Sequence, residues 1–378
     1  MIYAVPRLSS DELAVLAQID EMKTQLGFST RTPSRRWSGL LRRNSLARAI
    51  QGSNSIEGFV VTKDDAVAAA ENAEPLEASD ETWQAITGYR DAMTYVLQLA
   101  DDQHFSYASS LIKSLHFMMM KYDLAKRPGS WRPGPIYVQR DDGERVYEGS
   151  EAQLLPALVE ELVEDLNRAQ PAHCIVKAAM AHLNLVMIHP FSDGNGRMAR
   201  CLQALVLARD GNLHPVFCSI EEYLGRNTPA YYDVLAAVGG GKWRPTHDAR
   251  PWMRFCLRAH FFQVSTQIRR MKELALIWNA VEEEATRRRL PERVIVALVD
   301  AAQGYGVRNA SYRKSAEVSE QTASRDLKDL VEQGLLVAAG ERRGRTYLGS
   351  PTLRELFERL KLPRDIRDPF AKPRKSSR

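Results

Sequence analysis

The residues best suited to chemistry lie together between positions 189 and 200. This stretch reads HPFSDGNGRMAR and holds a histidine, a carboxylate, two glycines and two arginines within twelve residues. A histidine, with an ordinary pKa of about 6.5, can act as an unprotonated base at neutral pH. Arginines and converging backbone N–H groups bind phosphate. The combination predicts a phosphate site with a base beside it.

The local backbone is expected to present these groups between two helices. Pro190 steers the preceding residue away from helical geometry, which places His189 at the end of a richly apolar, buried helix over residues 172–188. The glycines that follow permit left-handed backbone, so that successive N–H groups can converge on an anion. A new helix starting near Asn195 then offers its N-terminus, which is itself a favourable phosphate site.

The charged side chains fit the same interpretation. Arg197 and Arg200 are three residues apart, project from one side of the second helix and suit a polyphosphate. Asp193 supplies the hard oxygen that a phosphate-bound Mg²⁺ requires.

This stretch resembles, at every fixed position, the HPFxDGNGRxxR motif of the Fic (filamentation induced by cAMP) family. The resemblance implies an all-helical core whose motif lies between two central helices and binds ATP with Mg²⁺. It implies that His189 takes the proton from a target hydroxyl, which then attacks the α-phosphate, and that Asp193 holds the metal. The residues implied in holding the α-, β- and γ-phosphates are Gly194, Asn195, Gly196, Arg197 and, for the γ-phosphate, Arg200.

A β-hairpin is predicted upstream of this motif, over residues 135–148. Ile136, Tyr137 and Val138 face residues 145–147 across a turn at 141–144, and this alternation around a glycine-containing turn is typical of a hairpin. The preceding segment, GSWR, resembles the G-x-W-R segment that often precedes the flap of Fic proteins. The resemblance implies that Ile136, Tyr137 and Val138 dock a target by strand addition, in which main-chain hydrogen bonds give the affinity.

A possible inhibitory element lies near the end of a helix predicted over residues 41–59. Ser53 and Glu57 are four residues apart and therefore share a face, and Gly58 is a helix stop. The segment resembles the S/T-x-x-x-E-G/N inhibitory motif found N-terminal to the core in one class of Fic proteins. The resemblance implies that Glu57 pairs with Arg200 and denies it to the γ-phosphate, for which a bidentate Arg–carboxylate pair is well suited.

The adenine site is expected downstream of the motif, where tyrosines offer a stacking face and a polar tip. Tyr231 and Tyr232 could both belong to the core of the next helix instead. Of the two, Tyr232 is the predicted adenine contact, with Asn227 as a hydrogen-bonding group.

Residues 291–350 form a separate small unit that resembles a winged helix-turn-helix. A helix over 292–302 precedes a helix-turn-helix pattern within 316–327, whose second helix is capped by Ser319, and two strands flank a basic tip at 341–345. This unit holds nine Lys/Arg and eight Asp/Glu, a net charge of +1. Because phosphate neutralisation normally dominates DNA affinity, DNA binding and a protein contact (dimerisation or target docking) are equally open.

The expected fold class is mainly α: a Fic helical core with a small β-hairpin flap, followed by a winged helix-turn-helix domain. Further helices are predicted over 10–26, 80–100, 105–121, 151–169 and 251–288. The expected division is an N-terminal helical region over 1–104, a Fic core over 105–260, a linker helix over 261–290, the winged unit over 291–350 and a C-terminal tail over 351–378, disordered from residue 363.

The composition excludes several classes of protein. The 378 residues are 44% apolar and 26% charged with a net charge of +5, ordinary values for a globular chain. The four cysteines form no CxxC pair, so zinc and disulfide frameworks are not expected. Apolar runs fall far short of the roughly 20 residues of a membrane span, and the N-terminus lacks a signal-peptide pattern. A cytoplasmic, reduced protein with no membrane partner is predicted.

Three functions are therefore considered. The first is transfer of AMP from ATP to a Tyr, Ser or Thr hydroxyl of a target protein or of the chain itself. The second is a Fic relative that removes AMP or moves another phosphate-containing group, and the third is a nucleotide-sensing, DNA-binding regulator. His189 and Asp193 favour catalysis, because phosphate binding alone needs neither. The sequence leaves a homodimer open.

Overall fold

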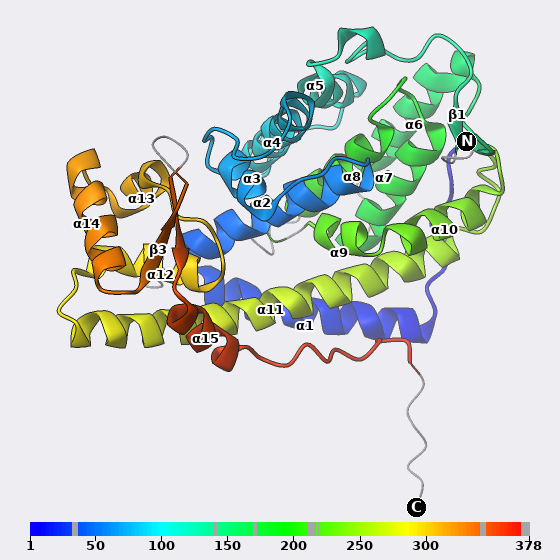
Figure 1. Ribbon diagram of the computed structural model, residues 1–378. Coiled ribbons are helices and arrows are strands. Elements are labelled where there is room, and N and C mark those ends of the chain that lie inside the picture. Colours follow the sequence, from blue (N-terminus) through cyan, green and yellow to red (C-terminus); the bar gives the residue numbers. More distant parts are fainter. Residues whose placement is uncertain are drawn as a thin grey trace, which may run out of the picture.

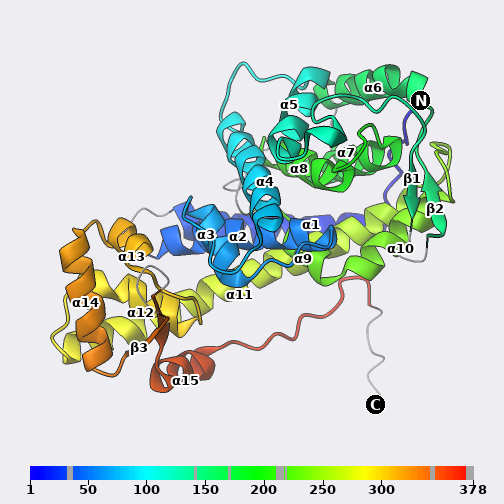
Figure 2. The ribbon, with the colours of Figure 1, turned by 45° about the horizontal axis from the view of Figure 1, so that its top comes forward.

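The computed structural model describes residues 1–31, 37–139, 143–168, 172–209, 217, 219–340 and 345–371. The described chain is mainly helical, and its strands pair as two small antiparallel hairpins (Figures 1 and 2). The elements of the larger part are α1 Ser10–Arg31, α2 Ser38–Ile56, α3 Lys63–Ala70, α4 Asp80–Leu99, α5 Ser109–Met120, β1 Tyr137–Gln139, β2 Arg145–Glu148, α6 Leu155–Asn167, α7 Cys174–Ile188, α8 Asn195–Ala208, α9 Glu221–Arg226, α10 Thr228–Gly239 and α11 Arg250–Arg287.

The centre of the molecule is the pair α7 and α8. Nearly all residues of α7 are buried, as its apolar sequence predicts, because α6, α8 and α11 pack against it. Trp252 of α11 is fully buried and its indole N–H donates to the Ala179 carbonyl of α7 at 2.7 Å. The turn between α7 and α8 is the predicted phosphate loop, so the core fixes both of its ends.

Helix α11 connects the main helical body with the C-terminal unit. It runs unbroken from Arg250 to Arg287, lies beside α1, and extends from the main helical body to the C-terminal unit (Figures 1 and 2). The predicted boundary between a core ending at 260 and a linker helix starting at 261 falls inside this helix. Since α1 packs along α11, the helix is part of the folded body as well as a connector.

Helix α2 crosses between the core and the C-terminal unit. It packs against α9, and Gly52 makes this contact possible: a Cβ there would lie 2.4 Å from the Glu221 carbonyl oxygen. The helix ends at Ile56, with Glu57 as its C-cap, and Gly58 follows with a φ of 86°. The inhibitory segment predicted from the sequence is therefore the last turn of α2 and the two residues after it.

The C-terminal unit comprises α12 Ile295–Ala302, α13 Asn309–Ala316, α14 Glu320–Glu332, β3 Leu336–Ala339, β4 Thr346–Gly349 and α15 Pro351–Leu360. Ser319 caps α14 by accepting from the Thr322 N–H, as predicted. The first helix of the pair begins earlier than expected, at Asn309. An isolated bridge joins Val307 to Tyr347 of β4, and the wing tip at 341–344 lies outside the described residues. The winged helix-turn-helix stays a prediction.

The end of the chain differs from the expectation. Residues 351–360 form α15, which packs on α12, and the segment that follows lies against α11 instead of being disordered. Asp368 pairs with Arg258 at 3.0 Å, and the Phe370 ring lies 4.1 Å from the Arg254 guanidinium. The prediction of disorder from residue 363 is therefore wrong up to residue 371, because these two side chains anchor the segment. Residues 372–378 lie outside the described part.

Candidate active site

His189 ends α7 in a left-handed conformation. Its φ and ψ are 56° and 57°, and its N–H donates to the Leu185 carbonyl at 3.0 Å. The imidazole Nδ1 lies 3.0 Å from the Val186 carbonyl oxygen. Because a carbonyl oxygen can only accept, Nδ1 carries the ring proton and the lone pair is on Nε2. The base predicted from the sequence is thus held in one tautomer.

The surroundings of His189 favour the neutral imidazole. Burial is the largest influence and lowers the pKa of His189 below its ordinary value of 6.5, while the hydrogen bond with Val186 opposes the shift. The positive charge of Arg132 lowers the pKa further. The ring can therefore accept a proton over the whole neutral range.

The loop after His189 is tied together internally. The Asn195 side chain accepts from the Phe191 N–H and donates to the Phe191 carbonyl, each at 2.9 Å. Gly194 has a φ of 73°, and α8 starts at the next residue, as predicted. The Asp193 side chain is 40% exposed and lies 3.7 Å from Lys126 Nζ. The loop thus combines a partly exposed carboxylate with a helix N-terminus.

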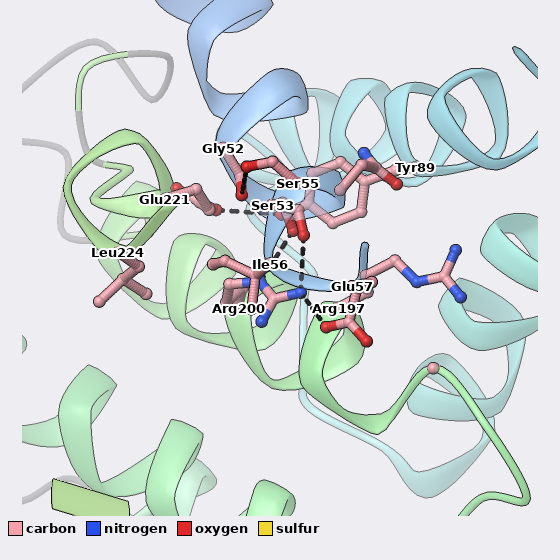
Figure 3. A network of polar contacts seen from close by, with 12 residues as sticks. Gly52, Ser53, Ser55, Ile56, Glu57, Tyr89, Arg197, Arg200, Glu221 and Leu224 are labelled. Carbon is pink, nitrogen blue, oxygen red and sulfur yellow. Dashed lines mark hydrogen bonds and ion pairs between the residues drawn. The ribbon is translucent and has the colours of Figure 1, made fainter. Parts of the chain in front are cut away.

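Arg200 is buried against the end of α2 (Figure 3). Its Nε donates to Ser53 Oγ at 2.8 Å, and its Nη2 donates to the Ser53 carbonyl at 2.9 Å and to Glu57 Oε1 at 2.5 Å. Its side chain is 1% exposed. Ser53, Glu57 and Arg200 are therefore in direct contact, and the inhibitory role that the resemblance implies for this contact stays a prediction.

The Glu57 carboxylate lies over the start of α8. A Cβ at position 196 would be 2.6 Å from Glu57 Oε1, so only glycine there leaves room for this carboxylate. Burial alone would raise the pKa of Glu57, but the charges of Arg200 and Arg197 outweigh it and bring the pKa below its ordinary value. Glu57 is thus a negative charge at a helix N-terminus, the position that favours an anion.

The Arg197 side chain is buried among a second group of residues. Its guanidinium donates to the Tyr122 hydroxyl at 3.2 Å, lies 3.0 Å from Met120 Sδ and is 5.5 Å from the centre of the Phe59 ring. Among the described residues, Arg197 Nε and Arg200 Nη1 are buried N–H groups with no hydrogen-bond partner. Buried N–H groups without a hydrogen-bond partner are costly, so these two atoms fit an anionic ligand.

ATP and Mg²⁺ can be tested against this geometry. The unpartnered arginine atoms suit phosphate oxygens, and the position above Gly196 already holds an anion, the Glu57 carboxylate. Within the described ranges, no three His, Cys, Asp or Glu side chains gather so as to hold a metal ion. A single exposed carboxylate, Asp193, remains. Since Mg²⁺ is commonly held by one or two carboxylates together with substrate phosphates, the donor set fits a metal that arrives with the nucleotide.

The predicted hairpin is present beside the base. Strands β1 and β2 pair antiparallel, with Tyr137 opposite Glu148 and Val138 opposite Tyr147. The Tyr147 hydroxyl donates to the Met187 carbonyl at 2.7 Å, which fixes the hairpin to the end of α7. Glu148 also bridges to Lys242, whereas no described residue pairs with the outer edge of β1. Residues 140–142 of the turn lie outside the described part.

The predicted adenine contacts lie at the same end of α2. The Tyr232 hydroxyl donates to the Ile56 carbonyl at 3.1 Å, and the ring is 45% exposed. Tyr231 is buried, with its hydroxyl 3.0 Å from His182 Nε2, so of the two tyrosines it is the core residue. The Asn227 amide donates to the Tyr223 carbonyl at 2.8 Å. The adenine roles stay predictions.

Two residues with contacts to the loop received no role from the sequence. His116 of α5 and Arg132, which precedes β1, both hydrogen-bond to backbone carbonyls of the loop. Burial lowers the pKa of His116 to about 4, so this ring is neutral. Neither residue lies inside the HPFxDGNGRxxR motif. Arg132 is the last residue of the GSWR segment, which was a signal for its place before the hairpin but gave it no role, and the helical position of His116 gives no periodic signal that separates it from an ordinary core residue.

A helical core carrying an HPFxDGNGRxxR loop between two central helices is the architecture of a Fic domain, and comparison with known proteins identifies it as one. Residues 106–207 match the Fic/DOC family. This stretch of the chain is therefore a Fic domain. No described helix is both long enough and apolar enough to cross a membrane.

The chain is similar to two proteins named as adenylyltransferases. It is 26% identical over 266 residues to Protein adenylyltransferase Fic of Nematostella vectensis, which covers 68% of this chain and 56% of that protein. It is 31% identical over 144 residues to Protein adenylyltransferase fic-1 of Caenorhabditis elegans, covering 36% of this chain and 26% of that protein. The chain thus spans about half or less of the length of these relatives.

Solved structures share the fold. A Fic family protein from Desulfovibrio desulfuricans G20 superposes with a TM-score of 0.59 at 20% identity and covers 92% of this chain and 98% of its own. Fic-1 of Caenorhabditis elegans, residues 134–508, superposes with a TM-score of 0.52 at 21% identity, covering 69% of this chain and 75% of its own. The expectation of a mainly helical Fic fold is confirmed.

Proposed function

We propose that this chain transfers AMP from ATP to a hydroxyl side chain of a protein. The observation that carries the proposal is the placement of a neutral imidazole, with its free Nε2, beside a helix N-terminus and two buried arginines. The names of the curated relatives support the same reaction. A Tyr, Ser or Thr hydroxyl, including one on the chain itself, has the required chemistry.

The bond changes follow from this arrangement. The target hydroxyl gives its proton to His189 Nε2 while its oxygen bonds to the α-phosphorus, and the bond from the α-phosphorus to the bridging oxygen breaks to release pyrophosphate. Arg197, Arg200 and the N–H groups at the start of α8 stabilise the charge that builds on the phosphates. When bound, Mg²⁺, held through Asp193, neutralises part of that charge.

The hairpin would hold the target. The outer edge of β1 has no described partner, and Ile136, Tyr137 and Val138 lie on the hairpin that Tyr147 fixes to the end of α7. An extended segment of the target can therefore add to β1 as a further strand. Its hydroxyl would then reach His189 from the open side of the loop.

The end of α2 would inhibit the reaction. Ser53 and Glu57 occupy two nitrogens of Arg200, and the Glu57 carboxylate lies over Gly196, where a phosphate would otherwise bind. Tyr232 also contacts this segment, because its hydroxyl donates to the Ile56 carbonyl. ATP would consequently bind without its γ-phosphate on Arg200 and in a pose unsuited to attack.

Label transfer tests the proposal directly. Wild type, Glu57→Gly and Glu57→Gly/His189→Ala are incubated with ATP labelled at the α- or the γ-phosphate, and labelled protein is measured. We expect label from α-labelled ATP alone, raised by Glu57→Gly and abolished by His189→Ala. Label from the γ-phosphate would indicate phosphorylation instead. No label with either donor would overturn the proposal in favour of AMP removal, another donor or nucleotide sensing.

A further inference from the structure

Arg132 holds the first half of the loop. Its Nε donates to the His189 carbonyl at 2.7 Å, and its backbone N–H donates to the Pro190 carbonyl at 2.9 Å. The other two guanidinium nitrogens donate to the carbonyls of Gly134 and Ser150, on either side of the hairpin. The side chain is buried, and each of its three nitrogens donates to a backbone carbonyl of the protein.

This contact explains an unfavourable backbone conformation. His189 has positive φ, which residues other than glycine rarely adopt and which persists where the surroundings fix it. Arg132 fixes the carbonyl of that residue and, through Gly134 and Ser150, joins it to both ends of the hairpin. The base and the hairpin thus share one buried cation.

His116 holds the second half of the loop. The Gly129 N–H donates to Nδ1 at 2.9 Å, so Nδ1 is unprotonated and Nε2 carries the proton that is donated to the Asp193 carbonyl, also at 2.9 Å. The ring stacks on Phe191, with centroids 3.6 Å apart and planes within 2°. His116 is fully buried.

We propose that His116 and Arg132 are positioning residues for AMP transfer. His116 sets the orientation of the loop at Asp193, and Arg132 sets the orientation of His189 relative to the hairpin. The proposal rests on the proposed function of the site. Neither side chain touches the reacting atoms, so each acts through the backbone carbonyl that it binds.

Paired substitutions in the active Glu57→Gly protein test the role of His116. Gln can place an amide N–H where Nε2–H lies and keep the bond to Asp193, whereas Asn is too short and keeps only an acceptor near the Gly129 N–H. We expect His116→Asn to lower kcat by about 10- to 100-fold, the effect of misplacing a reacting group by about 1 Å, with a much smaller loss for His116→Gln. KM for ATP and the melting temperature are measured alongside.

Three outcomes decide the question. Lower kcat in His116→Asn at similar melting temperature, recovered in His116→Gln, supports the role. Equal activity of the two variants, or losses that follow the melting temperature, would overturn it. An inactive Glu57→Gly parent would instead contradict the proposed function.

Arg132→Lys, which keeps the charge but cannot bind three carbonyls at once, is expected to lower kcat with target protein in the same way.

A different set of contacts joins α2 to the C-terminal unit. Arg43 of α2 makes a bidentate pair with Asp300 of α12, at 2.9 and 2.5 Å, and its Nη1 also lies 3.0 Å from Glu71 Oε1. All three side chains are only 12–13% exposed. Buried bidentate pairs of this kind fix orientation as well as distance.

The turn after α12 adds to this junction. The Tyr305 hydroxyl accepts from Arg48 Nη2 at 2.9 Å, and Lys63 Nζ lies 3.6 Å from the centre of the Tyr305 ring. The Gly306 N–H donates to Asp64 Oδ1 at 3.0 Å. The C-terminal unit therefore holds both α2 and α3. Arg43 and Ser53 are ten residues apart on one helix, about 15 Å along its axis.

We infer that the C-terminal unit keeps the inhibitory end of α2 in place through the Arg43–Asp300 pair. A helix transmits a constraint at one end to the other, so a partner that pulls the C-terminal unit from α2 would release Glu57 from Arg200. This inference also rests on the proposed function. It assigns to the C-terminal unit a regulatory role that needs no DNA contact.

The test combines Asp300→Asn with Glu57→Gly in the full chain. We expect Asp300→Asn alone to raise AMP transfer by about fivefold or more, the lower range of ordinary allosteric coupling, and to add nothing when Glu57 is already Gly. Arg293→Gln is the matched control, because Arg293 pairs with Asp326 inside the C-terminal unit and makes no described polar contact with α2.

The outcomes separate this inference from simple destabilisation. A misfolding variant would lower activity in both backgrounds, whereas release of α2 raises it in the wild-type background alone. Wild-type activity in Asp300→Asn, or equal activation by Arg293→Gln, would overturn the inference. Loss of AMP transfer in Glu57→Gly itself would contradict the proposed function instead.

Discussion

The phosphate loop and the segment that covers it are held in different ways. The loop between α7 and α8 is held by three buried side chains that bind its backbone: Asn195 within it, and Arg132 and His116 beside it. The covering segment after residue 52 contacts the site through Ser53 and Glu57 on one arginine, and Tyr232 holds it from outside the loop. Because the covering segment is anchored separately from the loop, it can leave Arg200 without any change in the loop itself.

Among these predictions, removing the base His189 should have the largest effect on the rate of AMP transfer. In the active Glu57→Gly protein, His189→Ala is expected to lower the rate of AMP transfer by about 10²–10⁴-fold, because proton transfer by a positioned side chain contributes that much. Nucleotide affinity should change little, since His189 makes no phosphate contact in the proposal. Steady-state rates and calorimetric ATP binding measure the two quantities. A variant that keeps its rate would show that the rigid loop serves binding alone.

Removing the Glu57 carboxylate that covers the loop should have the next largest effect on the rate of AMP transfer. Glu57→Gly is expected to raise AMP transfer by about 10- to 100-fold, because Arg200 can then make a charge-assisted hydrogen bond to the γ-phosphate worth roughly 1.5–3 kcal/mol. The same change leaves the buried Arg200 without its carboxylate and should lower the free energy of unfolding by on the order of 3 kcal/mol.

A matched variant separates the two consequences of that change. Glu57→Gln keeps the size of the side chain and removes the charge, so it should activate less than Glu57→Gly and destabilise less. Initial rates and urea unfolding curves measure both properties. If Glu57→Gly were less stable and no more active, the covering segment would be a structural support and not an inhibitor.

The same contrast governs what the sequence could predict. The loop was predicted residue by residue, because Pro190, two glycines and a helix start dictate local geometry. The contact between Glu57 and Arg200 required the family resemblance, since 143 residues separate them and no local rule joins them. His116 and Arg132 were missed as loop supports for the same reason.

Short helices were the main omissions in the fold. Helices α3 and α9 are short, and half of the residues of α3 are alanine, which has high helix propensity but gives no amphipathic pattern. The ordered segment up to residue 371 was missed because composition alone cannot reveal that Asp368 and Phe370 meet arginines of α11. Tertiary contacts, and not local preference, decide these regions.

The pH dependence of AMP transfer sharpens the description of the base. The pKa of His189 lies below 6.5 in the folded protein, so the rate in Glu57→Gly should be constant from about pH 6.5 to neutrality. It should fall by about tenfold per pH unit once the imidazole is protonated, below that lowered pKa. Rates at saturating ATP across pH 5–8 provide the measurement. A midpoint above 6.5 would indicate that His189 is not the titrating base.

The smallest expected effect concerns the packing beneath the inhibitory segment. Glu221, at the start of α9, is buried and accepts a hydrogen bond from the Tyr89 hydroxyl at 3.1 Å (Figure 3). Burial raises the pKa of Glu221 from 4.5 to about 7. The folded state thus binds this proton more tightly than the unfolded chain, so the contribution of Glu221 to the free energy of unfolding is largest below pH 4.5 and falls as the pH rises towards 7.

A comparison of wild type with Glu221→Gln isolates this contribution. The shift of about 2.5 pKa units corresponds to on the order of 3 kcal/mol, which wild type should lose between pH 4.5 and pH 7 relative to the variant. Urea unfolding at several pH values gives the change in the free energy of unfolding with pH for each protein. Because Glu221 lies against Gly52 and beside Tyr89, an identical pH slope in both proteins would mean that α9 supports the end of α2 by packing alone. A steeper loss of the free energy of unfolding in wild type would mean that the packing of α9 beneath the inhibitory segment weakens as the pH rises, while the contacts of the loop do not change.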